Sequence, residues 1–262
     1  MRGLFYFVVV SILSISTHAQ TNWVPGVKKK GKGDHILYFG LGSHRIFYTP
    51  GDIHFSSNKN PSFDFTLKNA KGKDNGFLRF NTAPQFSYYG GIYFTKKKFG
   101  LEYHYDHIKY FMRPNQVLRL KGTINGQQYD KDTLVGGDFV QLEHSDGGNY
   151  AMVNVVKWKR LAADKKEKHY LDLVMKAGVG IVNPKTNSTI MGNHYDEKYH
   201  FSGYVIGLES GLRYNFWKRF FVNGSFKMAY ANYNDFLIYG GKGKQQWLSA
   251  QFNFFVGTMF PL

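Results

Sequence analysis

The sequence contains no cysteine among its 262 residues. A disulfide scaffold and a Cys-ligated zinc or iron–sulfur site are therefore excluded. Acidic residues are also scarce, because 18 Asp and Glu stand against 34 Lys and Arg, giving a formal charge of +16. Long apolar runs are missing beyond the N-terminus, which excludes a polytopic helical membrane protein. What is abundant is aromatic side chains, at 18% of all residues, too many for a disordered chain.

The N-terminus has the pattern of a secretory signal peptide. Arg2 supplies a positive charge, residues 4–15 are mostly apolar, and Ala19 is a small residue at the expected cleavage position. The alternative is an uncleaved anchor helix, but the apolar run is short for a stable span. We predict a signal peptide over residues 1–19, cleaved near Ala19, followed by a basic periplasmic segment over residues 20–34.

The main pattern in the rest of the chain is alternation of apolar and polar residues with a period of two, typical of β-strands. Segments of 11 to 16 residues suit tilted membrane-spanning strands, which need about 9–11 residues, better than soluble strands of about 5–6. A barrel with lipid outside and a polar interior fits this pattern, whereas a soluble sandwich would bury the apolar face. Eight such segments cover residues 35–48, 85–95, 99–112, 149–161, 169–182, 201–216, 220–230 and 246–260.

The connections between these segments are alternately short and long, as in outer-membrane barrels. The long ones are expected over residues 49–84, 113–148, 183–200 and 231–245. The second contains Asn125–Gly126, a strong two-residue hairpin signal. The predicted fold class is therefore all-β, an eight-stranded antiparallel up-and-down transmembrane β-barrel over residues 35–262 with extended extracellular loops.

This pattern resembles the small eight-stranded outer-membrane β-barrel proteins of Gram-negative bacteria. The resemblance implies an outer-membrane location, and we expect a monomeric protein. Because the number of strands is even, both termini are expected on the short-turn side, in the periplasm. It depends on the alternation of the strands and on no specific motif, so it does not select an activity.

Basic residues are concentrated before the first strand and in the short turns, for example at Lys28–Lys30, Lys96–Lys98 and Lys218–Arg219. Attraction to anionic lipid head groups is worth about 1 kcal/mol per basic residue near a charged surface. The alternative is that these are simply solvated turns. We expect outer-membrane lipids as partners and no nucleic acid, because no recognition motif accompanies the charges.

Charged residues on the polar strand faces predict a network that fills the barrel interior. Buried charges need partners, and an eight-stranded barrel has room for little more than side chains. The alternative is a proton or ion pathway. His104 and His107 lie on opposite strand faces and cannot share a metal, so neither a metal nor a cofactor is expected. The predicted lumen network comprises Glu102, His104, Asp106, Asp172, Glu209, Arg213 and Lys227.

One stretch, Glu143-His144-Ser145-Asp146, contains residue types used by nucleophilic hydrolases. It resembles the eight-stranded outer-membrane lipid A deacylases, in which a His and a Ser two residues apart share a strand face. Here Ser145 directly follows His144, so the two point to opposite faces of a regular strand. The simpler reading is a rim strand that leads into a Gly-rich turn.

Two functions follow as hypotheses. The first is a plugged barrel that acts as a structural or binding scaffold, taking an extracellular ligand or protein through loops 49–84 and 113–148. The alternative is a lipid A-modifying hydrolase, so the sequence leaves enzymatic activity open.

Overall fold

The computed structural model describes residues 34–74, 85–144 and 146–262. The predicted signal peptide, most of the predicted basic segment over 20–34, and Ser145 lie outside these ranges. Every regular element in the described part is a β-strand. No helix in this part is long and apolar enough to cross a membrane.

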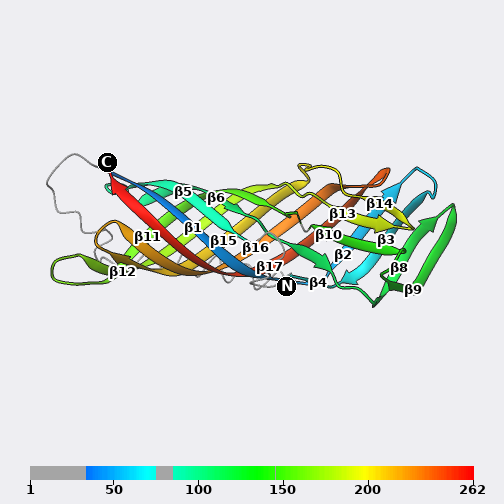
Figure 1. Ribbon diagram of the computed structural model, residues 1–262, viewed down its shortest axis with the longest axis horizontal. Helices are drawn as coiled ribbons and strands as arrows, with labels where there is room; N and C mark the ends of the chain where they lie inside the picture. The colour runs from blue at the N-terminus through cyan, green and yellow to red at the C-terminus, as the bar shows by residue number, and fades with distance from the viewer. Residues whose placement is uncertain (1–33, 75–84, 145) are drawn as a thin grey trace.

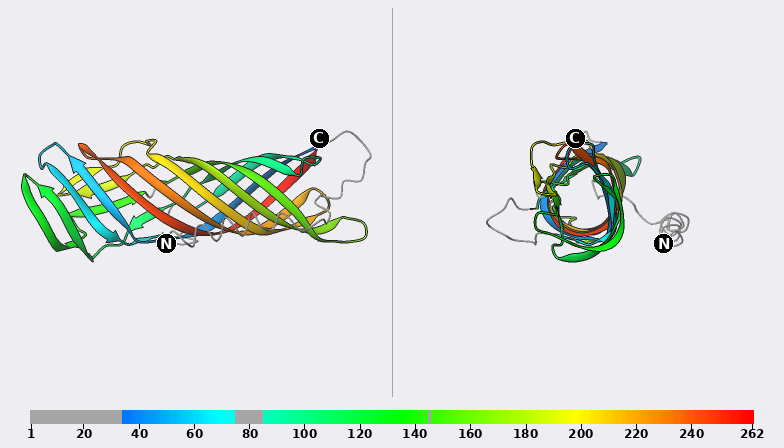
Figure 2. Two further views of the ribbon diagram at one scale, coloured as in Figure 1. Left: turned by 180° about the vertical axis from the view of Figure 1, so that it is seen from behind. Right: turned by 90° about the vertical axis from the view of Figure 1, so that its right-hand side faces the viewer.

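Eight strands form a closed antiparallel barrel, each paired with the next in chain order (Figure 1). The barrel closes where the first strand pairs with the last, from Ile36–Pro261 to Tyr48–Ser249. The end-on view shows the ring (Figure 2). The predicted eight-stranded up-and-down fold is therefore confirmed. The barrel strands are β1 (His35–Tyr48), β5 (Ser87–Phe94), β6 (Phe99–Asp106), β11 (Tyr150–Ala163), β12 (His169–Val182), β15 (Gly203–Phe216), β16 (Phe220–Ile238) and β17 (Gly241–Pro261).

The outer face of the barrel is apolar. Exposed aliphatic and phenyl side chains include Leu101, Val153, Ile206, Leu212 and Phe254. Aromatic rings border this belt at both ends, as in membrane barrels, where such girdles lie at the two interfaces. Near the short turns these are Phe94, Phe99, Phe216, Trp217 and Phe220, and toward the long loops they are Tyr88, Tyr105, Tyr204 and Tyr230.

The long connections build a second body, here called the head, at the end of the barrel opposite the C-terminus (Figure 1). Four strands continue the main sheet beyond β17, in the order β2, β3, β8 and β9. A second sheet has the order β14, β13, β10, β7 and β4. These strands are β2 (Gly51–Ser57), β3 (Phe63–Ala70), β4 (Gly72–Lys73), β7 (Tyr110–Met112), β8 (Gln116–Ile124), β9 (Gln127–Val135), β10 (Val140–His144), β13 (Asn187–Ile190) and β14 (Asn193–Tyr195).

The head has its own apolar core, to which both sheets contribute. Phe55, Phe65 and Leu120 from the main sheet and Val140 and Leu142 from the second sheet are buried in one cluster. The same cluster continues into the barrel through Tyr150, Met152 and Val205. The head therefore packs on the barrel as a structured extension.

Two predicted segments are wrong in their boundaries. Residues 231–245 are strands and not a loop, because β16 and β17 continue to a turn at Tyr239–Gly240. This hairpin is stable beyond the belt because Tyr233, Phe236 and Trp247 on its inner face are buried in the head core. The segment 99–112 is divided, since β6 ends at Asp106 and β7 joins the second sheet.

The prediction of a polar interior is also wrong in part. The end of the lumen near the short turns holds a buried cluster that includes Tyr38, Tyr93, Trp158, Phe221 and Phe255. Glycines in the wall make room for these rings. A Cβ at Gly40 would run into the Tyr89 ring, one at Gly91 would meet Tyr38, and one at Gly257 would meet Phe221.

Candidate functional site

The middle of the lumen contains a cluster of charged side chains from four strands. Glu102, His104 and Asp106 alternate along β6 and so share its inner face. The Lys176 ammonium lies 3.0 Å from Glu102 Oε1 and 3.3 Å from Glu209 Oε1. His104 places Nε2 3.1 Å from Asp106 Oδ1 and Nδ1 3.4 Å from Glu102 Oε1. Lys227 pairs with the other oxygen of Asp106.

A second charged group lies among the aromatic rings nearer the short turns. Asp172 Oδ2 accepts from Arg213 Nη2 at 3.0 Å, and Asp172 Oδ1 accepts from Arg160 Nε at 2.7 Å. The Arg213 guanidinium also lies 3.7 Å from the centroid of the Trp158 ring. Such cation–π contacts strengthen when the cation is desolvated, as Arg213 is here.

All seven residues of the predicted lumen network are buried inside the barrel. They divide into the two groups described above, and each has a partner of opposite charge. Removing one partner from a buried pair typically costs 3–5 kcal/mol, so these pairs fix β6, β12, β15 and β16 to one another. Arg160, His44 and Ser87 belong to the same interior but were not predicted. Arg160 was missed because it follows a run of basic residues that resembles a turn. His44 was missed because the alternation of apolar and polar residues around it is irregular.

The four candidate hydrolase residues do not form one group. His144 lies on β10 with no exposed surface, and its Nδ1 is 3.0 Å from Thr186 Oγ1. Its ring stacks on Tyr233, with centroids 5.3 Å apart. Asp146 lies on the outside and pairs with Lys185 at 2.7 Å. Glu143 is half-buried beside His144 on the strand, and Ser145 is outside the described residues.

Burial among these rings determines the protonation state of His144. Desolvation lowers the pKa of the imidazole to about 3, because the charged form has lost its water and gained no carboxylate. The chain between Asp34 and Leu262, where it is described, contains no cluster of His, Asp and Glu suited to a metal ion. His144 is therefore a neutral ring in an aromatic core.

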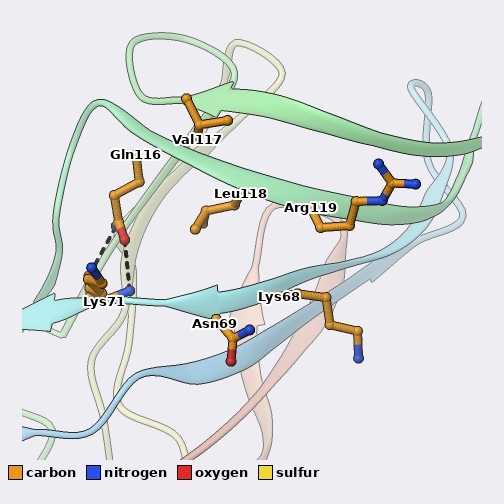
Figure 3. A pocket seen from close by; sticks show the side chains of 7 residues that line it. All are labelled: Lys68, Asn69, Lys71, Gln116, Val117, Leu118 and Arg119. Atoms are coloured by element: carbon orange, nitrogen blue, oxygen red, sulfur yellow. Dashed lines mark hydrogen bonds between the residues drawn. The ribbon is translucent and has the colours of Figure 1, made fainter.

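An open groove lies in the head where β3 and β8 separate. The two strands pair from Phe63–Ile124 to Leu67–Leu120 and then diverge. The gap of about 390 Å³ is lined by Lys68, Asn69, Lys71, Gln116, Val117, Leu118 and Arg119 (Figure 3). Gln116 bridges its closed end, because its Oε1 accepts from the Lys71 backbone N–H at 2.8 Å and its Nε2 donates to the Lys71 carbonyl at 3.1 Å.

Three cations and no carboxylate line this groove. Lys68 Nζ is 2.6 Å from Asp52 Oδ2, and Arg119 Nε is 2.6 Å from Asp130 Oδ1. Both pairs are about half exposed, and exposed pairs of this kind contribute at most about 1 kcal/mol. The cations are therefore oriented by weak interactions that an incoming anion can replace.

The aromatic girdles, the apolar belt and the charged lumen occur together in one closed barrel. The architecture is that of an outer-membrane β-barrel protein. No protein-family model matches the sequence, and no curated protein sequence matches it.

Three solved structures illustrate what the fold is similar to. The outer membrane protein OprG from Pseudomonas aeruginosa is 12% identical, with 91% of this chain and 100% of that chain covered and a TM-score of 0.36. Ail of Yersinia pestis, in complex with the heparin analogue sucrose octasulfate, is 11% identical, with 84% and 99% covered and a TM-score of 0.33. The outer membrane protease OmpT from Escherichia coli is 8% identical, with 90% and 99% covered and a TM-score of 0.27. The likeness is one of architecture and assigns no activity or ligand to this chain.

The groove residues were not predicted as a site. Their loops, 49–84 and 113–148, were proposed to bind a ligand, but Lys68 and Arg119 are 51 positions apart in numbering and share no motif. Only the pairing of β3 with β8 brings them together.

Proposed function

We propose that the protein is an outer-membrane barrel that binds an anionic polysaccharide outside the cell, in the groove between β3 and β8. In the proposed orientation the short turns of the barrel face the periplasm and the head faces the outside of the cell. The basic residues of the short turns support this orientation, because anionic lipids in the periplasmic leaflet of the outer membrane attract Lys and Arg.

The observation that carries the proposal is the groove itself. It opens on the head, which extends the barrel sheet and shares its core. Lys68, Lys71 and Arg119 supply donors to sulfate or carboxylate groups, and the Asn69 amide matches a sugar hydroxyl. The backbone frame of the groove is pre-formed by the pairing of β3 with β8, which avoids part of the ordering cost of binding.

Binding of dextran sulfate by the purified protein in detergent tests the proposal. We expect the wild type to bind dextran sulfate and not neutral dextran. Replacing Lys68, Lys71 and Arg119 by Gln should weaken binding at least tenfold, since each charge-assisted contact contributes about 1.5–3 kcal/mol.

The control is Lys242→Gln with Lys244→Gln, which removes two positive charges where the groove variant removes three. These two exposed lysines lie on β17 in the same head but outside the groove. If the control variant loses as much binding as the groove variant, the attraction comes from overall charge and the groove proposal is rejected.

The hydrolase alternative receives no support from an observed constellation, because His144 is enclosed by rings and has no exposed surface. It stays a prediction with a direct test. Mass spectrometry of lipid A from cells that carry wild-type protein or His144→Ala would reject it if the acylation patterns were identical.

A further inference from the structure

The lipid-facing wall of the barrel has a hollow next to one of the short turns. Its volume is about 520 Å³, and its lining is almost entirely apolar. It crosses the outer surface of β1, β16 and β17 and is bordered by Phe39, Leu41, Phe220, Val222, Val256 and Thr258.

Two glycines of the barrel wall lie at the floor of the hollow. Gly40 and Gly257 are paired across β1 and β17 and have no side chains of their own. The space on their inner side is taken by the rings of Tyr89 and Phe221, which a Cβ on either glycine would strike. Both positions therefore face the lumen, and the floor of the hollow between the outward-facing side chains is bare backbone of β1 and β17.

A basic turn stands at the end of the hollow. Phe216 and Phe220 line the hollow and also flank the turn Trp217-Lys218-Arg219. The Met259 backbone N–H donates to the Arg219 carbonyl at 2.7 Å, which holds the turn against β17. Within the described part of the chain no carboxylate lies within ion-pair distance of Lys218 or Arg219, and Asp34 at the same end pairs with Lys96.

We infer that this hollow and turn form a binding site for one anionic phospholipid of the periplasmic leaflet. An acyl chain lies in the hollow, and the phosphate head group meets Lys218 and Arg219 at the interface, where the exposed Trp217 ring also belongs. The charge of the turn selects a lipid with net negative charge over a zwitterionic one. This inference rests on the membrane placement proposed above but not on the groove.

Native mass spectrometry of the protein in detergent, titrated with dioleoyl phosphatidylglycerol or dioleoyl phosphatidylethanolamine, tests the site. We expect one phosphatidylglycerol to be retained in preference to phosphatidylethanolamine. Lys218→Gln with Arg219→Gln should weaken phosphatidylglycerol binding about 30-fold, from about 1 kcal/mol for each charge. Thr258→Phe fills the hollow and should abolish retention of both lipids.

The matched control is Lys165→Gln with Lys166→Gln in the turn between β11 and β12, which removes the same charge at the same end of the barrel. Equal loss in this control, or unchanged retention in Thr258→Phe, overturns the inference. Heat-dependent migration on SDS gels verifies that each variant is folded. A wild-type protein that fails to insert into vesicles would instead contradict the membrane placement itself.

Discussion

His144 shows how burial alone can set the behaviour of a titratable residue. Its Nδ1 has Thr186 as a partner, and rings of Tyr233 and Phe236 surround the imidazole. The sequence placed this residue beside Ser145 and Asp146 and so suggested chemistry. In the folded head its neighbours are contributed by β16 and by residue 186, and they indicate a core residue.

The lowered pKa of His144 predicts an acid-sensitive head. Below about pH 6.5 the unfolded chain takes up a proton at this residue, whereas the folded head takes it up only near pH 3, where the pKa of His144 lies. The stabilising effect of the neutral ring is therefore fully present above pH 6.5. It is lost as the pH falls, by about 1.4 kcal/mol per pH unit.

Comparing His144→Phe with the wild type measures this effect. Urea unfolding between pH 4 and 7, followed by tryptophan fluorescence, should show a smaller loss of unfolding free energy in the variant on acidification. Thr186→Val is the control, because it removes the hydrogen-bond partner and should lower stability equally at every pH. Identical pH slopes in wild type and His144→Phe would show that His144 is not held neutral.

Lys227 and Asp106 form an enclosed ion pair of the lumen, each at most 2% exposed. Lys227→Met leaves the Asp106 carboxylate without its ammonium partner, and we expect a loss of about 3–5 kcal/mol in the free energy of unfolding. Urea titration in detergent micelles gives the value. Lys242→Met breaks the exposed pair with Asp235 and should cost under about 1 kcal/mol. If Lys227→Met also cost less than about 1 kcal/mol in the free energy of unfolding, water would have to reach the Asp106 carboxylate.

At the scale of elements, the sequence predicted strands best where one face is apolar and exposed on the outside of the barrel. In β12 and β15 the alternation is regular, and the predicted ranges 169–182 and 201–216 differ from the observed strands by two residues at most. Residues 241–245 were missed because Gly and Lys dominate them locally. They pair with β16 on one side and with β2 on the other, for example Gly243 with Phe236 and with Phe55, and the local sequence contains no sign of β2 as a partner.

The β8–β9 hairpin offers a test of a single element. Its turn residues Asn125 and Gly126 both have positive φ, at 48° and 78°. Gly126→Val places a β-branched residue in this left-handed conformation, which costs at least 1–2 kcal/mol, although a Cβ there meets nothing within 4 Å. We expect limited proteolysis to cut the hairpin more rapidly while the barrel stays intact.

Gly224→Ala is the corresponding control. Gly224 lies on the outer, exposed side of β16, has no positive φ and also has free space for a Cβ. Its cleavage pattern should match that of the wild type. Faster cleavage of both variants would point to a general loss of stability and not to the hairpin turn.

At the scale of the whole molecule, the sequence predicted the closed barrel, the charged interior positions and the hairpin at Asn125–Gly126, but not the two-sheet head that contains it. Alternation of apolar and polar residues shows which face of a strand is apolar. That information is enough to predict a single closed sheet. The two sheets of the head enclose a core made from four separate connections, so its apolar residues show no common period.

The contents of the barrel predict a molecule that conducts no ions. Rings such as Tyr93 and Trp158 stack 4.0 Å apart inside it, and the charged groups are paired with one another. We expect no stable single-channel conductance of the wild type in planar bilayers. Regular conductance steps would show that the interior opens and would favour the ion-pathway alternative.

The length of β17 has a mechanical consequence. This strand has 21 residues and so extends for about 70 Å. It pairs with β16 and β1 in the barrel wall and with β2 in the head. A ligand that pulls on the head would therefore load these strands along their length. Many hydrogen bonds would then have to shear at once before the head separated from the barrel, so we expect the connection between them to resist force.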